Sequence, residues 1–234
     1  MTFALVRADA IYTVPFASPA LELLGGIPDL IRNLYRMFAD RYPGIPVGAF
    51  RALSSNNLSE VGLQVSLLNG QLEISMRVDQ MSVQATNLRS PQETRFAQDC
   101  ALLMDAFMEK TTAATEGAVT LRIASWRNVD VGKDGVAEIL ARAATPQCSP
   151  FDPAWVGAER MDHFLRMTFQ NLTARWQLLF GAEPAAIPDA NLYLLRDYQF
   201  LPGGEFDTTE KRLGFLEMSS KAICEWLGIG TLAE

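Results

Sequence analysis

The sequence predicts an α+β protein in which antiparallel meander sheets are covered by capped helices. Three observations lead to this prediction: runs in which apolar and polar residues alternate, an Asn-Gly pair between two such runs, and two capping boxes that each open an apolar-faced helix. The chain has 234 residues, 49% of them hydrophobic and 20% charged, which is enough apolar material for one large domain or two small ones.

The Asn69-Gly70 pair is the clearest local signal. Apolar residues alternate with polar or small ones over residues 61–67 before it and 72–78 after it. Asn-Gly supplies the positive φ angles that a two-residue type I′ turn needs. Closing that turn pairs Leu67 with Leu72 and puts every large apolar residue of both strands on one face. The sequence therefore predicts a hairpin in a defined register.

The other elements of the first half, residues 1–128, follow from similar signals. They are a strand at 3–14 that Pro15 stops, a helix at 27–38 with Pro28 in its first turn, a third meander strand after a change of phase at residues 79–80, a helix opened by the capping box Ser90-Pro91-Gln92-Glu93, and a strand at 119–128. The capped helix is expected to cover the apolar face of the hairpin.

The second half repeats this plan after a connection at residues 129–160, which we interpret as a short helix and a Pro-rich loop. Residues 161–234 contain three alternating runs and a second capping box, Asp207-Thr208-Thr209-Glu210, which opens a final helix that ends near Gly228. Both halves are thus interpreted as a β-meander followed by a helix, an arrangement that suggests duplication without residue-level identity.

Charge and cysteine content restrict the function classes and the compartment. The net charge is -7 and the 20 Lys and Arg residues are dispersed, which disfavours general nucleic-acid binding and binding to anionic membranes. No apolar run is long enough to span a bilayer, and residues 1–14 lack the pattern of a signal peptide. Cys100, Cys148 and Cys224 show no metal-ligand or disulfide spacing, so a reducing cytoplasm is expected. Cys100 and Cys224 are expected in the core, and Cys148 is the one candidate reactive thiol.

No motif in the sequence identifies a reaction, a metal or a cofactor. His163 is the only histidine, the acidic residues show no spacing that brings two onto one metal, and the glycine motifs of dinucleotide, phosphate and hydrolase sites are missing. The most site-like cluster is Trp126-Arg127 with Arg122 on the same strand, because an indole and a guanidinium can grip an anionic or planar ligand. The alternative is a strand edge where the tryptophan packs and the arginine extends over apolar surface.

The final helix carries more apolar surface than one sheet needs. It has two apolar stripes, of which the second is a candidate oligomer interface: Leu213, Leu216, Ile223 and Leu227 form the first, and Phe215, Met218, Ala222 and Trp226 the second. Either the helix is wedged between two layers, or the second stripe faces another protein.

The order of elements resembles a sporadically distributed family of uncharacterised bacterial proteins of about this length. The resemblance covers nearly the whole chain and includes the strand at 119–128, which in that family tends to read like RYINRI and here contains LRIASWRNV, followed later by LYLLRDY before the last helix. Because that family has no assigned activity, the resemblance implies no functional residues.

These observations lead to one main functional hypothesis and two alternatives. The main one is a non-enzymatic protein-binding or assembly module without a cofactor, a component of a bacterial multi-gene system such as anti-phage defence, that binds a protein partner or itself. The first alternative is a small-molecule or nucleotide-binding enzyme with a site between the two halves, where Arg122, Trp126, Arg127 and His163 converge. The second is a ligand carrier with an apolar cavity between sheet and helices.

Overall fold

The protein folds as one antiparallel sheet with helices on one side. The computed structural model describes residues 3–111, 117–144 and 164–228. The strands in these ranges are β1 (Phe3–Pro15), β2 (Phe50–Leu53), β3 (Gly62–Leu67), β4 (Leu72–Arg77), β5 (Gln80–Leu88), β6 (Val119–Val129), β7 (Leu165–Asn171), β8 (Trp176–Pro184) and β9 (Leu192–Phe200). The α-helices are α1 (Glu22–Arg41), α2 (Pro91–Thr111), α3 (Gly132–Ala144) and α4 (Thr209–Leu227).

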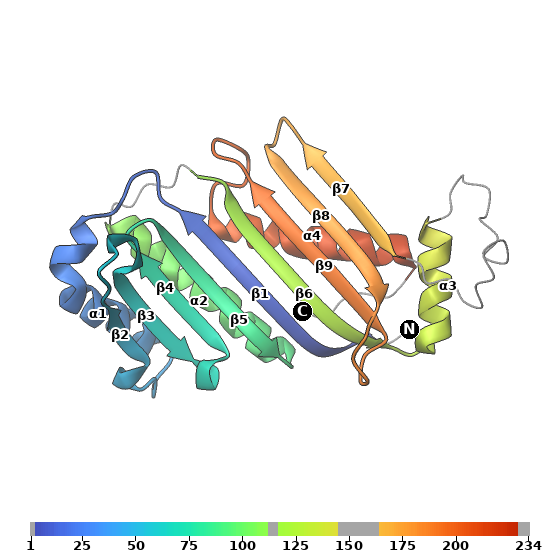
Figure 1. Ribbon diagram of the computed structural model, residues 1–234, viewed down its shortest axis with the longest axis horizontal. Coiled ribbons are helices and arrows are strands. Elements are labelled where there is room, and N and C mark those ends of the chain that lie inside the picture. The colour runs from blue at the N-terminus through green and yellow to red at the C-terminus, as the bar shows by residue number, and fades with distance from the viewer. Residues whose placement is uncertain (1–2, 112–116, 145–163, 229–234) are drawn as a thin grey trace.

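The nine strands form a single sheet in the order β2-β3-β4-β5-β1-β6-β9-β8-β7, and all neighbouring strands are antiparallel. Helices α2 and α4 lie across the back of this sheet, and α1 and α3 lie near its two ends (Figure 1). The predicted class, α+β with an antiparallel sheet covered by helices, is therefore confirmed.

The strand order contains an internal repeat. Strand β1 is followed by α1, the meander β2–β5 and α2, while β6 is followed by α3, the meander β7–β9 and α4. Each of the two central strands pairs with the last strand of its own meander, β1 with β5 and β6 with β9, and the two also pair with each other. The repeat thus starts again at β6, within the range that the sequence assigned to the first half. The expected domain boundaries stay a prediction.

The Asn69-Gly70 hairpin has the register that the sequence predicts. Strands β3 and β4 pair with Leu67 opposite Leu72, and every second pair along the ladder is apolar. Asn69 and Gly70 have φ angles of 55° and 87°, the positive values that a type I′ turn requires. Strand β4 then turns tightly into β5, as the change of phase predicts.

Both predicted helix starts are present. The Ser90 hydroxyl accepts from the N–H of Glu93 at 3.2 Å, and the Glu93 carboxylate accepts from the N–H of Arg89 at 2.7 Å. At the start of α4 the cap lies one residue later than the predicted box Asp207–Glu210, because the Thr208 hydroxyl accepts from the N–H of Lys211 at 3.3 Å. These bonds satisfy N–H groups that have no partner within the helix, so they fix where α2 and α4 begin.

The first helix differs from the sequence prediction. It begins at Glu22, so Pro28 lies inside the helix and not in its first turn. The residues before Pro28 supply an extra turn, and the proline leaves one carbonyl of that turn without its usual N–H donor. The apolar face of α1 is placed as expected, because Leu34 and Phe38 are fully buried.

A glycine substitution tests how much the hairpin turn contributes to stability. Replacing Gly70 by alanine forces a side chain into a left-handed backbone with φ of 87°, whereas a Cβ at Gly70 would meet no atom within 4 Å. We expect Gly70→Ala to lower the free energy of unfolding by about 1 kcal/mol in a urea titration. Gly48→Ala is the matched control, because Gly48 also has open space and lacks a positive φ. An equal loss in both variants would contradict the strain argument.

Candidate functional site

The open face of the sheet, turned away from the helices, carries two of the predicted site residues, Arg122 and Trp126 on β6. Arg122 lies opposite Asp197 of β9, and its guanidinium contacts that carboxylate through Nε at 3.0 Å and Nη2 at 2.5 Å. The pair is partly exposed to solvent. The charge of Arg122 is therefore matched within the sheet itself.

Trp126 sits between two neighbours on this face. The guanidinium of Arg7 lies 4.7 Å from the centre of the indole ring, and the ring of Tyr193 on β9 lies 5.0 Å from it. Arg7 is in turn bound by the carboxylate of Asp9 at 2.6 Å and 3.1 Å. Because Arg7 and Arg122 on this face each contact a carboxylate, their charges are largely neutralised and offer little attraction to an anion.

The other two predicted residues do not join this cluster. Arg127 is the chain neighbour of Trp126, and successive side chains of a strand point to opposite faces, so Arg127 lies on the helix side with only 2% of its surface exposed. His163 lies outside the described residues. Arg122, Trp126, Arg127 and His163 are thus not brought together within the part of the chain that the structure describes, because a dipeptide in a strand cannot present both side chains on one face.

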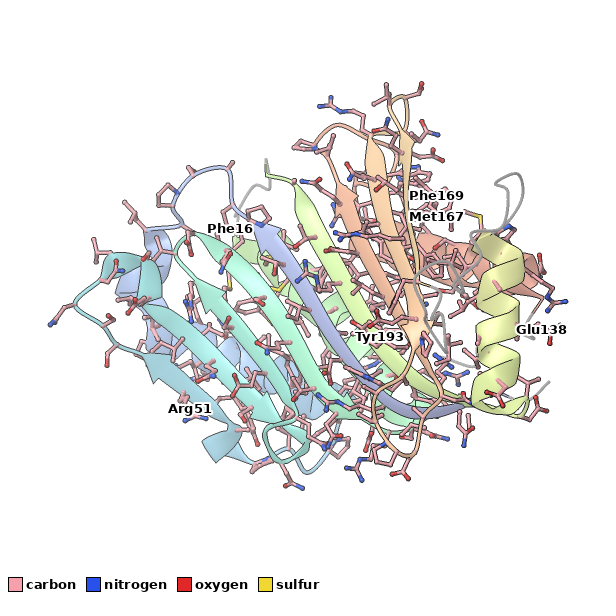
Figure 2. The ribbon with its side chains drawn as sticks, turned by 45° about the vertical axis from the view of Figure 1, so that its right-hand side comes forward. Phe16, Arg51, Glu138, Met167, Phe169 and Tyr193 are labelled. Atoms are coloured by element: carbon pink, nitrogen blue, oxygen red, sulfur yellow. The ribbon has the colours of Figure 1, made fainter. Side chains whose placement is uncertain are left out.

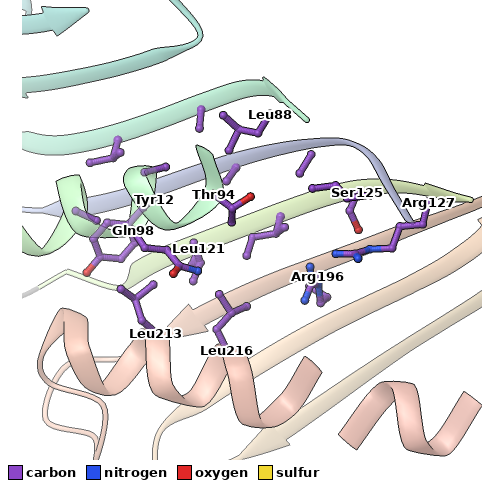
Figure 3. A pocket seen from close by; sticks show the side chains of 18 residues that line it. Tyr12, Leu88, Thr94, Gln98, Leu121, Ser125, Arg127, Arg196, Leu213 and Leu216 are labelled. Atoms are coloured by element: carbon purple, nitrogen blue, oxygen red, sulfur yellow. The ribbon is translucent and has the colours of Figure 1, made fainter. Parts of the chain in front are cut away.

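Beneath β1 and β6 lies a small, partly open cavity of about 60 Å³. Arg127 and Arg196 lie at one end and Tyr12 and Gln98 at the other (Figure 3). Between them the lining is mainly apolar and small, with residues such as Ala8, Ala10, Ala97, Ala101, Leu121 and Leu216. Sites for drug-sized ligands are several times larger, about 300 Å³ or more. This cavity beneath β1 and β6 therefore has no room for a nucleotide.

The polar groups around this cavity have mostly structural contacts. Arg196 donates to the hydroxyl of Ser220 on α4. Tyr12 accepts from Arg212 at 2.8 Å and shares a hydrogen bond of 2.8 Å with Thr209, and burial raises the pKa of its phenol. These bonds tie β1 and β9 to α4. They give the arginines a role in holding the helix layer on the sheet.

The described residues contain neither a cluster that could bind a metal ion nor an exposed thiol. No group of three or more His, Cys, Asp or Glu side chains there could hold a metal ion. Cys100 and Cys224 are buried, and burial raises the pKa of Cys100 to about 12. Both lie in the core as expected, and a protonated, buried thiol is not nucleophilic. Cys148 lies outside the described residues. None of the described helices is long and apolar enough to cross a membrane.

An apolar groove lies on the helix side of the sheet, between α4 and the last two strands, β7 and β8. We call it the α4–β7 groove. Its volume is about 530 Å³, and its lining residues are Met167, Phe169, Trp176, Leu178, Phe215, Met218, Ser219, Ala222, Ile223 and Trp226. All four residues of the second stripe of the final helix lie along it. Met167 and Phe169 lie on the outermost strand, β7 (Figure 2).

The groove has a buried floor and exposed walls. Phe215 is 7% exposed, and its ring lies 4.7 Å from that of Trp176 and 4.6 Å from that of Phe206. By contrast, Phe169 is 41%, Met218 60% and Trp226 48% exposed. Phe215 therefore belongs to the core, while the walls leave three large apolar side chains in solvent.

The position of α4 explains why the groove is open. The buried residues of the helix include Leu216, Ile223, Cys224 and Leu227, which face the sheet. On β7 the exposure rises along the strand, from buried Leu165 to exposed Phe169. Beside the second half of β7, the cover that the helix gives to the sheet thus ends at β8. Among the described residues no second layer covers the outer side of α4, so the wedged arrangement is not observed.

Comparisons with known proteins add no function. The chain matches no protein-family model, and a search of curated proteins also gave no match. The resemblance to the family of uncharacterised bacterial proteins therefore stays a prediction.

A pair of serine variants tests the polar contacts around the cavity beneath β1 and β6. The hydroxyl of Ser125 is buried and has no hydrogen-bond partner among the described residues, whereas that of Ser220 accepts from Arg196. We expect Ser125→Ala to raise the free energy of unfolding by about 1 kcal/mol, because it removes a desolvated hydroxyl. Ser220→Ala should lower it by a similar amount, because it removes a partner of a buried charge. A loss in both variants would contradict the assignment of Ser125.

The burial of the thiols predicts that they stay unreactive even at a pH at which an exposed thiol is ionised. In a Cys148→Ser variant, the two remaining cysteines are Cys100 and Cys224, and we expect neither to react with a disulfide reagent in the native protein. A free thiol, with a pKa of about 8.5, is mostly ionised at pH 9. Burial holds the pKa of Cys100 at about 12, so its thiol stays protonated there. Rapid native reaction at pH 9 that matches the rate in denaturant would contradict this burial.

Proposed function

We propose that this protein is a non-enzymatic protein-binding or assembly module and that its binding site is the α4–β7 groove. The observation that carries the proposal is the clustering of Phe169, Met218 and Trp226, three exposed apolar side chains, along one groove. Isolated exposed apolar residues are ordinary on protein surfaces, but contiguous ones mark a surface that is covered by a partner.

The composition of the groove favours a protein partner over a small polar ligand. Its walls combine a tryptophan, a phenylalanine and two methionines, Met167 and Met218, and it contains no charged side chain. Tryptophan is enriched among the residues that dominate binding energy at interfaces, and methionine adapts its shape to different partners. Covering the exposed half of each large side chain contributes about 1 kcal/mol per residue.

The proposal extends to the setting in which the protein acts. We place it in the cytoplasm, as a member of the family of uncharacterised bacterial proteins and as a component of a multi-gene system such as anti-phage defence, with a protein and not a nucleic acid as its partner. The net charge of -7 and the carboxylate contacts of Arg7 and Arg122 support the last point. The enzyme hypothesis has less support, because its described candidate residues share no pocket.

A peptide selection tests the groove directly. Random peptides displayed on phage are selected on the immobilised protein, and the selected peptides are then titrated against two variants. Met218→Asp places a charge in the groove, while Leu58→Asp is the control, because Leu58 has the same exposed fraction, 60%, and does not line the groove. We expect apolar peptides whose Kd rises at least about tenfold in Met218→Asp and is unchanged in Leu58→Asp.

Two results would contradict the proposal: a selection that yields no peptide from the monomeric protein, or peptides that bind both variants equally well. Phe215→Asp is not a suitable variant, because it would place a charge in the core and unfold the surrounding cluster.

A further inference from the structure

The sheet ends in two edge strands that differ in their protection. Natural edge strands are blunted by short length, proline, lysine or a charge that points inward. Strand β2 has four residues, whereas β7 has seven. The β7 sequence, LRMTFQN, contains neither proline nor lysine, and its only charge is Arg166. Figure 1 shows α3 near the beginning of β7 and no described element beside the rest of this edge.

The sequence of β7 is complementary to itself in the antiparallel direction. With a two-fold axis at Thr168, the middle residue of the strand, Met167 of one copy lies opposite Phe169 of the other, on the groove face. On the open face, Arg166 lies opposite Gln170, and Thr168 lies opposite its own copy. No like charges face each other, and apolar Met167 and Phe169 meet each other, while Leu165 at the buried end of the strand lies opposite Asn171. A two-fold interface requires this kind of self-complementarity.

This pairing would also place the two α4–β7 grooves next to each other on the same side of a continuous sheet. The exposed surfaces of Phe169 and Met167 would then lie against those of the second copy, close to Met218 and Trp226. Main-chain hydrogen bonds between the two β7 strands supply affinity, and the side chains at alternate positions supply specificity.

We infer that the partner at the α4–β7 groove is a second copy of this chain, joined through antiparallel β7–β7 pairing centred on Thr168, so that the two grooves form one continuous surface. This inference rests on the proposed function of the groove as a protein-binding site, and it names the partner. Each copy carries a net charge of -7, and this repulsion opposes association. The dimer therefore forms more readily at higher ionic strength, which screens the repulsion.

Sedimentation equilibrium over a range of concentrations measures the dimer dissociation constant, and four surface variants test the register. Because residue 168 meets its own copy, both Thr168→Glu and Thr168→Lys place like charges together and weaken the dimer. At residue 170 the sign of an introduced charge determines whether the dimer is strengthened or weakened, because the opposite residue is Arg166. Gln170→Glu strengthens the dimer and Gln170→Lys weakens it, each by about fivefold. This combination is specific to the proposed axis.

Cross-linking gives an independent measurement. In a Cys148→Ser background, Thr168→Cys brings two thiols across the axis within the distance of a disulfide, so mild oxidation yields a covalent dimer. Thr120→Cys is the matched control, because Thr120 lies on β6 at the centre of the sheet, away from the edge. The background variant retains only the buried Cys100 and Cys224.

The outcomes separate this inference from the function on which it rests. The inference is overturned if the protein is a strict monomer at all concentrations. It is also overturned if the dimer dissociation constant is the same in all four charge variants and the Thr168→Cys variant does not cross-link. The peptide selection is repeated with Thr168→Lys, which favours the monomer. Peptides that bind this variant in the groove, together with a monomeric wild-type protein, leave the groove proposal standing and show that its occupant is another chain or another segment of this one.

Discussion

The antiparallel pairing of β1 with β6 is the interaction on which the rest of the structure depends. It runs from Phe3 opposite Val129 to Thr13 opposite Thr120, with one irregularity between Leu5 and Arg7. Each strand also pairs with the last strand of its own meander, so this one ladder joins two half-sheets into one. Without it, the apolar faces of both halves would end at an open edge, and α2 and α4 would not meet behind the centre of the sheet.

The same pairing determines which part of the sheet is covered by helices and which part is left exposed. At the centre, polar bonds from α4 to Tyr12 and Arg196 fix the helix layer, and the ion pairs of Arg7 and Arg122 neutralise the opposite face. Because α4 is held near the centre, it does not reach the outermost strand. The apolar residues at the far edge are therefore left without a cover from the described part of the chain, and this is why we propose the edge as the place for a partner.

Local chemistry in the sequence was enough to predict the fold class, the β3–β4 register and the starts of α2 and α4. The turn angles of Asn69-Gly70 and the caps at Ser90 and Thr208 depend on neighbouring residues only. The continuous sheet and the edge position of β7 depend on pairing between distant segments, which no local pattern contains. Trp126-Arg127 shows how far a functional site can be predicted from the sequence. Both residues were recognised as candidates, but the alternation of side chains along the strand puts them on opposite faces of the sheet. The second stripe of α4 was recognised because an excess of apolar surface is visible in the helix alone.

Amide hydrogen exchange of β7 tests most directly the central claim, that this edge pairs with the same edge of a second copy. Exchange is measured at low and at high protein concentration, and the amides of Leu165–Asn171 are compared with those of the other edge, Phe50–Leu53. Increased protection of β7 at high concentration, with no change in β2, is the result that the account predicts. Unchanged protection of β7, or protection gained only elsewhere on the sheet, would contradict it.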